Sequence, residues 1–122
     1  MRTLTLRELN RATLARQLLL ERKKVTAPTV IERLAGLQAQ WPPSPYIGLW
    51  ARVSGFTRAS LESAILRGVV LKPTVMRGTL HLVTARDYPI FWWALLLILL
   101  VQENPRPGAE KGTSGIAAAE KH

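Results

Sequence analysis

Two glutamines separated by one alanine, Gln38-Ala39-Gln40, and a single internal histidine, His81, are the residues whose types could take part in chemistry. An amide is neither a useful acid nor a useful base near pH 7, so Gln38 and Gln40 cannot contribute by proton transfer. Their carbonyl oxygens can orient a water molecule and place a dipole near a developing positive charge. The structural alternative is that both are ordinary polar groups at the end of a helix, just before a proline-rich loop.

His81 lies between Leu80 and Leu82 in a β-rich run. A packed or phosphate-facing histidine suits that position better than a catalytic one. The chain has no cysteine, and its second histidine, His122, is distant along the chain. This composition excludes a disulfide framework and a thiolate metal site, and we expect neither zinc nor another cofactor.

The excess positive charge is confined to the first part of the chain. The net charge is +9; residues 1–87 hold 14 Lys and Arg against 5 Asp and Glu, and residues 88–122 hold 3 of each class. A basic folded domain is the electrostatic footprint of a protein that binds phosphate backbones, so we expect double-stranded DNA as the partner. A merely solvated basic surface is the alternative. The N-terminus has no apolar signal segment, which favours a cytoplasmic location.

Leucines at helical spacing predict a first helix over residues 4–22, with Thr5 and Glu8 as its capping box and two lysines closing it at 23–24. A second helix begins at Thr26, carries Pro28 in its first turn and is expected to end near Gln40.

Two further helices follow the proline-rich stretch. One restarts at Ser44-Pro45 and stops at Gly55; the next is capped by Thr57 or Ser60 and ends at Gly68. After it, two β-rich runs meet around Arg77-Gly78, as in a hairpin, and Pro73 marks the first run as an edge strand.

Short helices followed by a β-hairpin in a basic chain predict a mainly α, α+β fold of the winged helix-turn-helix type over residues 4–87. The helix at about 58–67 would lie nearest the recognition position, and the hairpin at about 70–84 would be the wing. The four tryptophans, Trp41, Trp50, Trp92 and Trp93, are expected in the core. Trp41 has an alternative as a wedge near DNA.

The last part of the chain differs in character. Thr84 and Asp87 form a capping-box pattern ahead of an apolar helix over residues 88–102. This run is shorter than the roughly 20 residues that a membrane span needs, so we expect a buried helix and no membrane partner. Residues 103–122 are rich in Pro, Gly, Ala and Ser and are expected to be disordered. Such an ending is typical of a truncated or frame-disrupted chain, whereas a dimerising helix is the alternative; the pattern does not indicate an oligomeric state.

Four stretches carry a resemblance to a known family: LNRATLARQLLLER, RLAGLQAQ, PYIGLWARVSGF and MRGTLHLV. Together they resemble the winged-helix DNA-binding proteins related to the AlkZ/YcaQ-type DNA glycosylases, from about Leu4 to about Leu95. That family consists of longer proteins with tandem winged-helix units around a positively charged, concave DNA-binding face. The resemblance therefore implies that this chain corresponds to the first portion of such a protein.

In the glycosylase branch of that family, a Gln-apolar-Gln motif carries catalysis, and Gln38-Ala39-Gln40 matches it position by position. The resemblance implies hydrolysis of the N-glycosidic bond of alkylated purines, including those in interstrand crosslinks. A purine alkylated at N7 is already cationic and leaves without protonation, so a site that lacks a general acid suits this substrate. We expect no turnover from the 122 residues alone, because a single module cannot enclose a nucleotide as a tandem array would.

The candidate DNA contacts are four cations or hydroxyls and the histidine: Arg58, Arg67, Arg77, Thr79 and His81. A solvated arginine at the tip of the wing is the alternative for Arg77. Two other classes of function stay open. One is a non-catalytic DNA-binding transcriptional regulator, and the other is a protein-interaction or membrane-associated fragment that acts through the apolar run Ile90–Val101.

Overall fold

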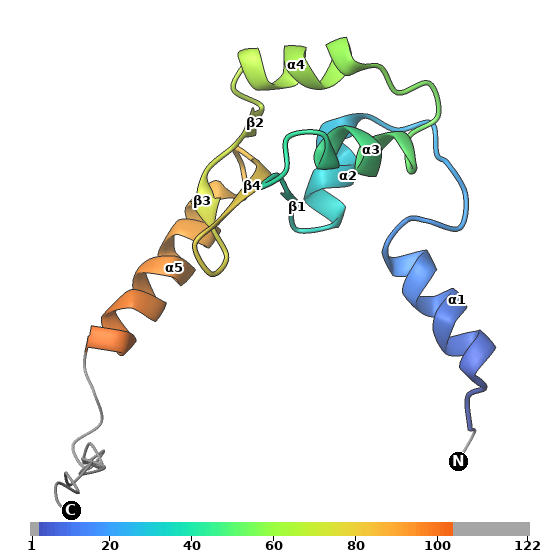
Figure 1. The fold of residues 1–122 in the computed structure, drawn as a ribbon, viewed down its shortest axis with the longest axis horizontal. Helices are drawn as coiled ribbons and strands as arrows, with labels where there is room; N and C mark the ends of the chain where they lie inside the picture. The colour runs from blue at the N-terminus through green and yellow to red at the C-terminus, as the bar shows by residue number, and fades with distance from the viewer. Residues whose placement is uncertain (1–2, 104–122) are drawn as a thin grey trace, which may run out of the picture.

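The protein has an α+β fold, and the computed structural model describes residues 3–103 (Figure 1). Five helices and four short strands occur in these residues. In chain order they are α1 (Leu6–Arg16), α2 (Ala27–Arg33), β1 (Leu37–Gln38), α3 (Ser44–Trp50), α4 (Arg58–Leu66), β2 (Val70–Leu71), β3 (Thr74–Val75), β4 (Thr79–Thr84) and α5 (Tyr88–Glu103). The elements form an arch whose centre holds α2, α3 and the sheet, with α4 above them and with α1 and α5 as the two ends (Figure 1).

The helix starts follow the predicted caps. Thr5 and Glu8 form the complete capping box of α1. Thr26 accepts a hydrogen bond from the third residue of its helix, and α2 carries proline in its first turn. Of the two candidates for α4, Thr57 is the N-cap, and its side chain accepts from the backbone N–H of Ser60. A side-chain acceptor at this position satisfies one of the free N–H groups of the first turn, which fixes where the helix begins.

The predicted end of the first helix is wrong, because α1 stops at Arg16 and Leu18 has a φ of 55°. Downstream of this point the backbone at Lys23 forms hydrogen bonds with a segment distant in sequence. The N–H of Lys23 donates to the carbonyl of Arg52 at 2.8 Å, and the N–H of Ser54 donates to the carbonyl of Lys23 at 2.8 Å. Lys23 therefore lies in an isolated parallel bridge with Val53 and does not close the helix.

The second helix also ends earlier than predicted. It stops at Arg33, and the backbone then reverses through Ala35 at φ 55° and Gly36 at φ 110°. A Cβ built on Gly36 would lie 3.2 Å from the carbonyl oxygen of Leu82, so glycine permits both the turn and the close approach to β4. The segment that was expected to be the end of a helix is strand β1 and its continuation. The third helix likewise ends at Trp50, ahead of Gly55.

The sheet is antiparallel and is built around β4. Strand β1 pairs with one edge of β4, and the sheet order is β1-β4-β2, with β3 also paired to β4. The hairpin expected around Arg77-Gly78 is confirmed as the turn between β3 and β4, and both residues have positive φ. Pro73 lies between β2 and β3, which pair with β4 at an edge of the sheet, as the proline predicted. Its carbonyl accepts a hydrogen bond from the N–H of His81 at 3.0 Å.

One main hydrophobic core lies between the sheet and the helices α2, α3 and α4. Its fully buried large side chains come from all of these elements: Val30, Ile31, Leu49, Leu61, Val70 and Leu82. No residue of α1 is buried. The core therefore stabilises the segment from about residue 25 to residue 84, which also holds the sheet.

Helix α5 begins after a hydrogen-bonded pair, in which the Thr84 hydroxyl donates to the Asp87 carboxylate at 2.8 Å. The expectation that this apolar helix is buried is wrong for this chain. Its apolar side chains are largely exposed, and of the described elements the helix packs mainly against β3. Among residues 3–103, no helix is long and apolar enough to cross a membrane. The predicted disordered tail lies outside the described residues, apart from Glu103, which ends α5.

The expectation that the tryptophans fill the core is also wrong. All four are exposed: Trp41 precedes α3, Trp50 ends α3, and Trp92 and Trp93 lie on α5. The core is filled by the smaller side chains of isoleucine, leucine and valine. The tryptophans are therefore available to contacts outside the described part of the fold.

Candidate functional site

The two glutamines lie on one exposed face of the sheet. Gln38 is in β1 and Gln40 continues the same extended segment, while Ala39 between them is 1% exposed and belongs to the core. Successive side chains of an extended strand lie on opposite faces, so the Gln-Ala-Gln spacing puts both exposed glutamine side chains on one face and the buried methyl group of Ala39 on the other. The motif therefore presents two adjacent amides on a strand, where a helix end was expected.

Main-chain and side-chain bonds hold this segment against β4 and α3. The Ala39 N–H donates to the Leu80 carbonyl at 2.8 Å. The Gln40 side-chain Oε1 accepts from the Leu80 N–H at 3.1 Å, which extends the strand pairing by one side-chain bond. The Ser44 hydroxyl at the start of α3 donates to the main-chain carbonyl of Gln38 at 2.7 Å. The position of both glutamines is thus fixed by their backbone, and one amide oxygen is already engaged.

His81 lies directly across the strand pair from Gln38 in the antiparallel register. Residues paired in this way have their side chains on the same face, so the imidazole joins the two amides there. Its Nδ1 lies 3.0 Å from the carbonyl oxygen of Thr79. A carbonyl can only accept, so Nδ1 carries the proton, and in the neutral ring Nε2 is left as the acceptor.

Thr79 stabilises the same strand end, since its hydroxyl donates to the Met76 carbonyl at 3.1 Å. Thr79 and His81 are half-buried, whereas Gln38 and Gln40 are exposed. The fold therefore brings four of the seven predicted site residues together, and we call Gln38, Gln40, Thr79 and His81 the amide face. This face can hold and orient water or a sugar-phosphate group through several neutral donors and acceptors.

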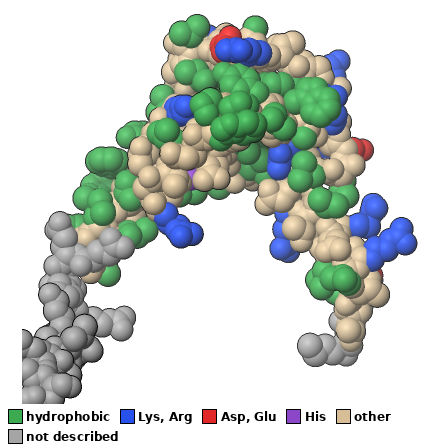
Figure 2. Space-filling model, in the orientation of Figure 1, with side chains coloured by type: hydrophobic (Ala, Val, Ile, Leu, Met, Phe, Trp, Pro, Cys, Tyr) green, Lys and Arg blue, Asp and Glu red, His purple; other side chains and the backbone are tan. Residues whose placement is uncertain are grey.

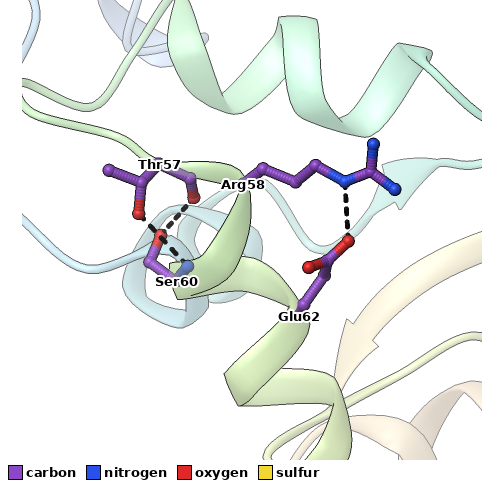
Figure 3. Close-up of polar contacts among 4 residues, drawn as sticks. All are labelled: Thr57, Arg58, Ser60 and Glu62. Carbon is purple, nitrogen blue, oxygen red and sulfur yellow. Dashed lines mark hydrogen bonds and ion pairs between the residues drawn. The ribbon is translucent and has the colours of Figure 1, made fainter.

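The predicted arginines lie elsewhere. Arg58 and Arg67 are at the two ends of α4, which lies at the top of the arch, whereas Arg77 is in the exposed turn between β3 and β4, which lies below the sheet (Figure 1). Arg58 forms an ion pair with Glu62 at 2.7 Å, on the side of α4 shown with its Thr57–Ser60 cap in Figure 3. The hydrogen bond to Glu62 raises the pKa of Arg58. Arg67 donates weakly to the Ser63 carbonyl at 3.3 Å.

Two arginines that the sequence did not single out connect the segment after α1 to α3. Arg22 donates through Nε and Nη2 to the Val53 carbonyl, at 3.2 and 2.8 Å. Arg52 donates to the carbonyls of Gln17 and Gly48, at 2.7 and 2.8 Å, and partial burial lowers its pKa. The bonds of Arg22 to Val53 and of Arg52 to Gln17 reach across more than thirty residues of sequence, which explains why no local pattern pointed to these two arginines.

An apolar hollow beside α3 was also missed. It has a volume of about 540 Å³ and is lined by prolines, aromatic rings, one isoleucine and one arginine: Pro42, Pro43, Tyr46, Ile47, Trp50, Phe56 and Arg58. Hydrophobic side chains gather over this part of the surface in Figure 2. The sequence feature that could have indicated this hollow is the run WPPSPYIGLW, which is rich in prolines and aromatic residues. In the described residues no group of three or more His, Cys, Asp or Glu side chains is placed to hold a metal ion.

Comparisons with known proteins point to one family. The family model described as DNA glycosylase AlkZ-like matches residues 31–121, which extends beyond Leu95, where the motifs placed the end of the resemblance. The solved structure of Streptomyces sahachiroi DNA glycosylase AlkZ is similar with a TM-score of 0.59 and 29% identity, over 64% of this chain. This chain spans about a fifth, 21%, of the length of that structure. A comparison with curated proteins gives no match.

Proposed function

Because the chain belongs to the AlkZ-like DNA glycosylase family, we propose that it is a winged-helix module that binds double-stranded DNA and supplies the amide pair of a glycosylase site. The reaction is hydrolysis of the N-glycosidic bond of alkylated purines, including purines in interstrand crosslinks. The observation that carries this proposal is the placement of Gln38 and Gln40 together on one exposed strand face, with His81 across from Gln38.

The order of the elements supports the winged-helix part of the proposal. Helix α2, strand β1, helices α3 and α4, and then a hairpin follow one another along the chain, and β4 pairs between β1 and β2. In a winged helix the helix before the hairpin enters the major groove and the hairpin contacts the neighbouring backbone. By this analogy α4 is the recognition helix and the β3–β4 turn with Arg77 is the tip of the wing.

The chemistry of the amide face suits a leaving group that needs no acid. An N7-alkylated purine carries a positive charge and leaves with the electron pair of the C1′–N9 bond as a neutral base. Water then adds to C1′ and releases its proton to the solvent. The amide oxygens of Gln38 and Gln40 orient that water and stabilise the developing oxocarbenium charge by their dipoles.

A chimera tests the catalytic proposal. In this chimera, residues of this chain replace the portion of the Streptomyces AlkZ that they match, and release of 7-methylguanine from duplex DNA is measured. We expect Gln38→Ala with Gln40→Ala to lower the excision rate by about 100-fold or more, as loss of a preorganised dipole does in other enzymes. Gln102→Ala, a change of the same type on α5 and inside the matched residues 31–121, is the control. Unchanged excision in the double variant would show that the amide pair is not catalytic.

The bond from Leu80 to Gln40 favours a second candidate, because an amide that serves the strand pairing is a structural group. In that case the chain is a non-catalytic DNA-binding regulator. It would bind one duplex sequence preferentially, and the chimera would bind alkylated DNA and leave the base in place. The excision assay therefore distinguishes the two candidates.

A further inference from the structure

The hollow beside α3 has the composition of a site for a flat ring. Three of its lining residues are aromatic, and the prolines Pro42 and Pro43 form a rigid wall. Trp50 is 58% exposed, so a large part of the indole is uncovered within the described residues. An aromatic side chain on a helix surface that stays open to solvent, beside a preformed hollow, offers a face on which another ring can stack.

Two guanidinium groups already stack on the rings around this hollow. Arg22 lies over the Trp50 ring at 4.9 Å from its centroid, and Arg58 lies over the Tyr46 ring at 5.5 Å. Each arginine keeps its charge beside an aromatic face, and no acidic residue lines the hollow. Glu62 pairs with Arg58 from outside the lining of the hollow, but no acid pairs with Arg22 in the contacts that hold it. The hollow therefore combines ring surface with positive charge, which complements a ring that carries a phosphate.

The hollow is also adjacent to the amide face along the chain. Its wall begins at Pro42, two residues after Gln40, and the hydrogen bond from Ser44 to the Gln38 carbonyl fixes the start of α3 against β1. A nucleic-acid strand that crosses the amide face could therefore continue over α3.

We propose that the α3 hollow is a binding site for an unpaired nucleotide, in which the base stacks on Trp50 and Tyr46 and the phosphate contacts Arg22 and Arg58. The inference rests on the proposed function only for the identity of the partner, DNA. It extends that function from duplex to single-stranded or locally opened DNA. Stacking of bases on aromatic side chains, with cations along the backbone, is the usual way in which proteins hold unpaired strands without reading sequence.

A proline-rich peptide is the rival ligand, because aromatic-lined grooves also bind extended proline segments. The charge decides against it: two arginines at the ring faces give no advantage to a neutral peptide, whereas they neutralise phosphates. The peptide is accordingly an outcome of the test.

The experiment uses the full chain and a short oligothymidylate, with binding measured by fluorescence anisotropy. We expect Trp50→Ala to weaken binding by about tenfold or more, in line with alanine substitutions of stacking residues. Trp50→Phe keeps a ring and should retain most of the affinity. Trp93→Ala removes a similarly exposed tryptophan from α5 and should leave the affinity unchanged. Equal losses in Trp50→Ala and Trp93→Ala would overturn the proposal.

A second measurement does not depend on the stability of a variant. In the ¹⁵N-labelled chain, oligothymidylate should shift the indole N–H signal of Trp50 and leave that of Trp93 in place. An unmoved Trp50 signal, or a shift produced by a polyproline peptide and not by the oligonucleotide, would overturn the nucleotide site. The excision assay of the chimera is a separate test. If oligothymidylate shifts the Trp50 signal but the double glutamine variant still excises the base, only the catalytic proposal is rejected and the nucleotide site stands.

Discussion

At the residue scale, Gln38 and Gln40 differ in the hydrogen bonds of their side chains. The Gln40 amide accepts a hydrogen bond from the backbone of β4, whereas the bond at Gln38 uses its main-chain carbonyl. We expect Gln40→Ala to lower the free energy of unfolding by about 0.5–1 kcal/mol, since a solvent-exposed bond lies at the lower end of the usual range. Gln38→Ala should cost less than about 0.5 kcal/mol. Urea unfolding of the two variants measures the difference, and equal costs would mean that the Leu80 bond adds no stability.

The sequence identifies which residues form the amide face but not how they meet. Residue type and spacing are enough to single out Gln38, Gln40 and His81. The register that places His81 across from Gln38 depends on pairing between segments about forty residues apart, and no local pattern encodes it. In contrast, the ion pair of Arg58 with Glu62 has the (i, i+4) spacing of a helix and was available from the sequence.

At the scale of elements, helix starts were predictable, and so was the end of α4 at Leu66, just ahead of Gly68, whereas the ends of α1 and α2 were not. A start depends on a cap within four residues, and Thr5, Thr26 and Thr57 provide it. The ends of α1 and α2 depend on distant partners, namely the bridge between Lys23 and Val53 and the pairing of β1 with β4. Strand β1 was missed for the same reason, because a two-residue strand has no periodicity of its own.

Gly36 gives a prediction at this scale, because the turn between α2 and β1 requires it. Gly36→Ala puts a Cβ at φ 110° and 3.2 Å from the Leu82 carbonyl, so we expect a loss of about 2–3 kcal/mol in the free energy of unfolding. Gly78→Ala is the matched control, since its φ of 76° is also positive but its Cβ would meet nothing within 4 Å. It should cost about 1–2 kcal/mol. Thermal and urea unfolding measure both; a smaller loss for Gly36→Ala would contradict the close approach.

The exposed side of α5 gives a second prediction. Ile90, Trp93, Leu97 and Val101 follow helical spacing and form one of the most exposed apolar stripes of the molecule, with Val101 at 73%. A contiguous stripe of this kind promotes association. We expect the chain to elute in size-exclusion chromatography at a volume that decreases with concentration, and Leu97→Glu with Val101→Glu to remove that dependence without lowering the unfolding midpoint.

Leu66→Glu is the control for α5, because Leu66 is an exposed leucine on α4, outside the stripe. If it changed the elution volume as much as the α5 variant did, association would depend on general surface hydrophobicity and not on the stripe.

At the scale of the whole molecule, the arch separates two kinds of surface. The central core fixes α4, the sheet and the hairpin relative to one another, while α1 and α5 extend from it (Figure 1). The charge divides the molecule differently, since the excess of Lys and Arg lies in residues 1–87, with Arg7, Arg11 and Arg16 in α1, whereas α5 carries no Lys or Arg. Composition was sufficient to predict this division, because net charge per segment does not depend on register or on the exact ends of helices.

The confined charge leads to a prediction on DNA binding. For a duplex ligand, the logarithm of the affinity should fall linearly with the logarithm of salt concentration, by about 0.9 for each phosphate contacted. Arg77 lies at the exposed hairpin turn and no ion pair holds it among the described contacts, so Arg77→Ala should reduce the slope by about 1. Arg86→Ala removes an equal charge from a residue that is already paired with Glu32 at 2.9 Å, so it should change the slope less. Anisotropy titrations at several salt concentrations measure both slopes. Equal changes in the two variants would mean that the duplex responds to the net charge of the module and that the hairpin turn makes no phosphate contact of its own.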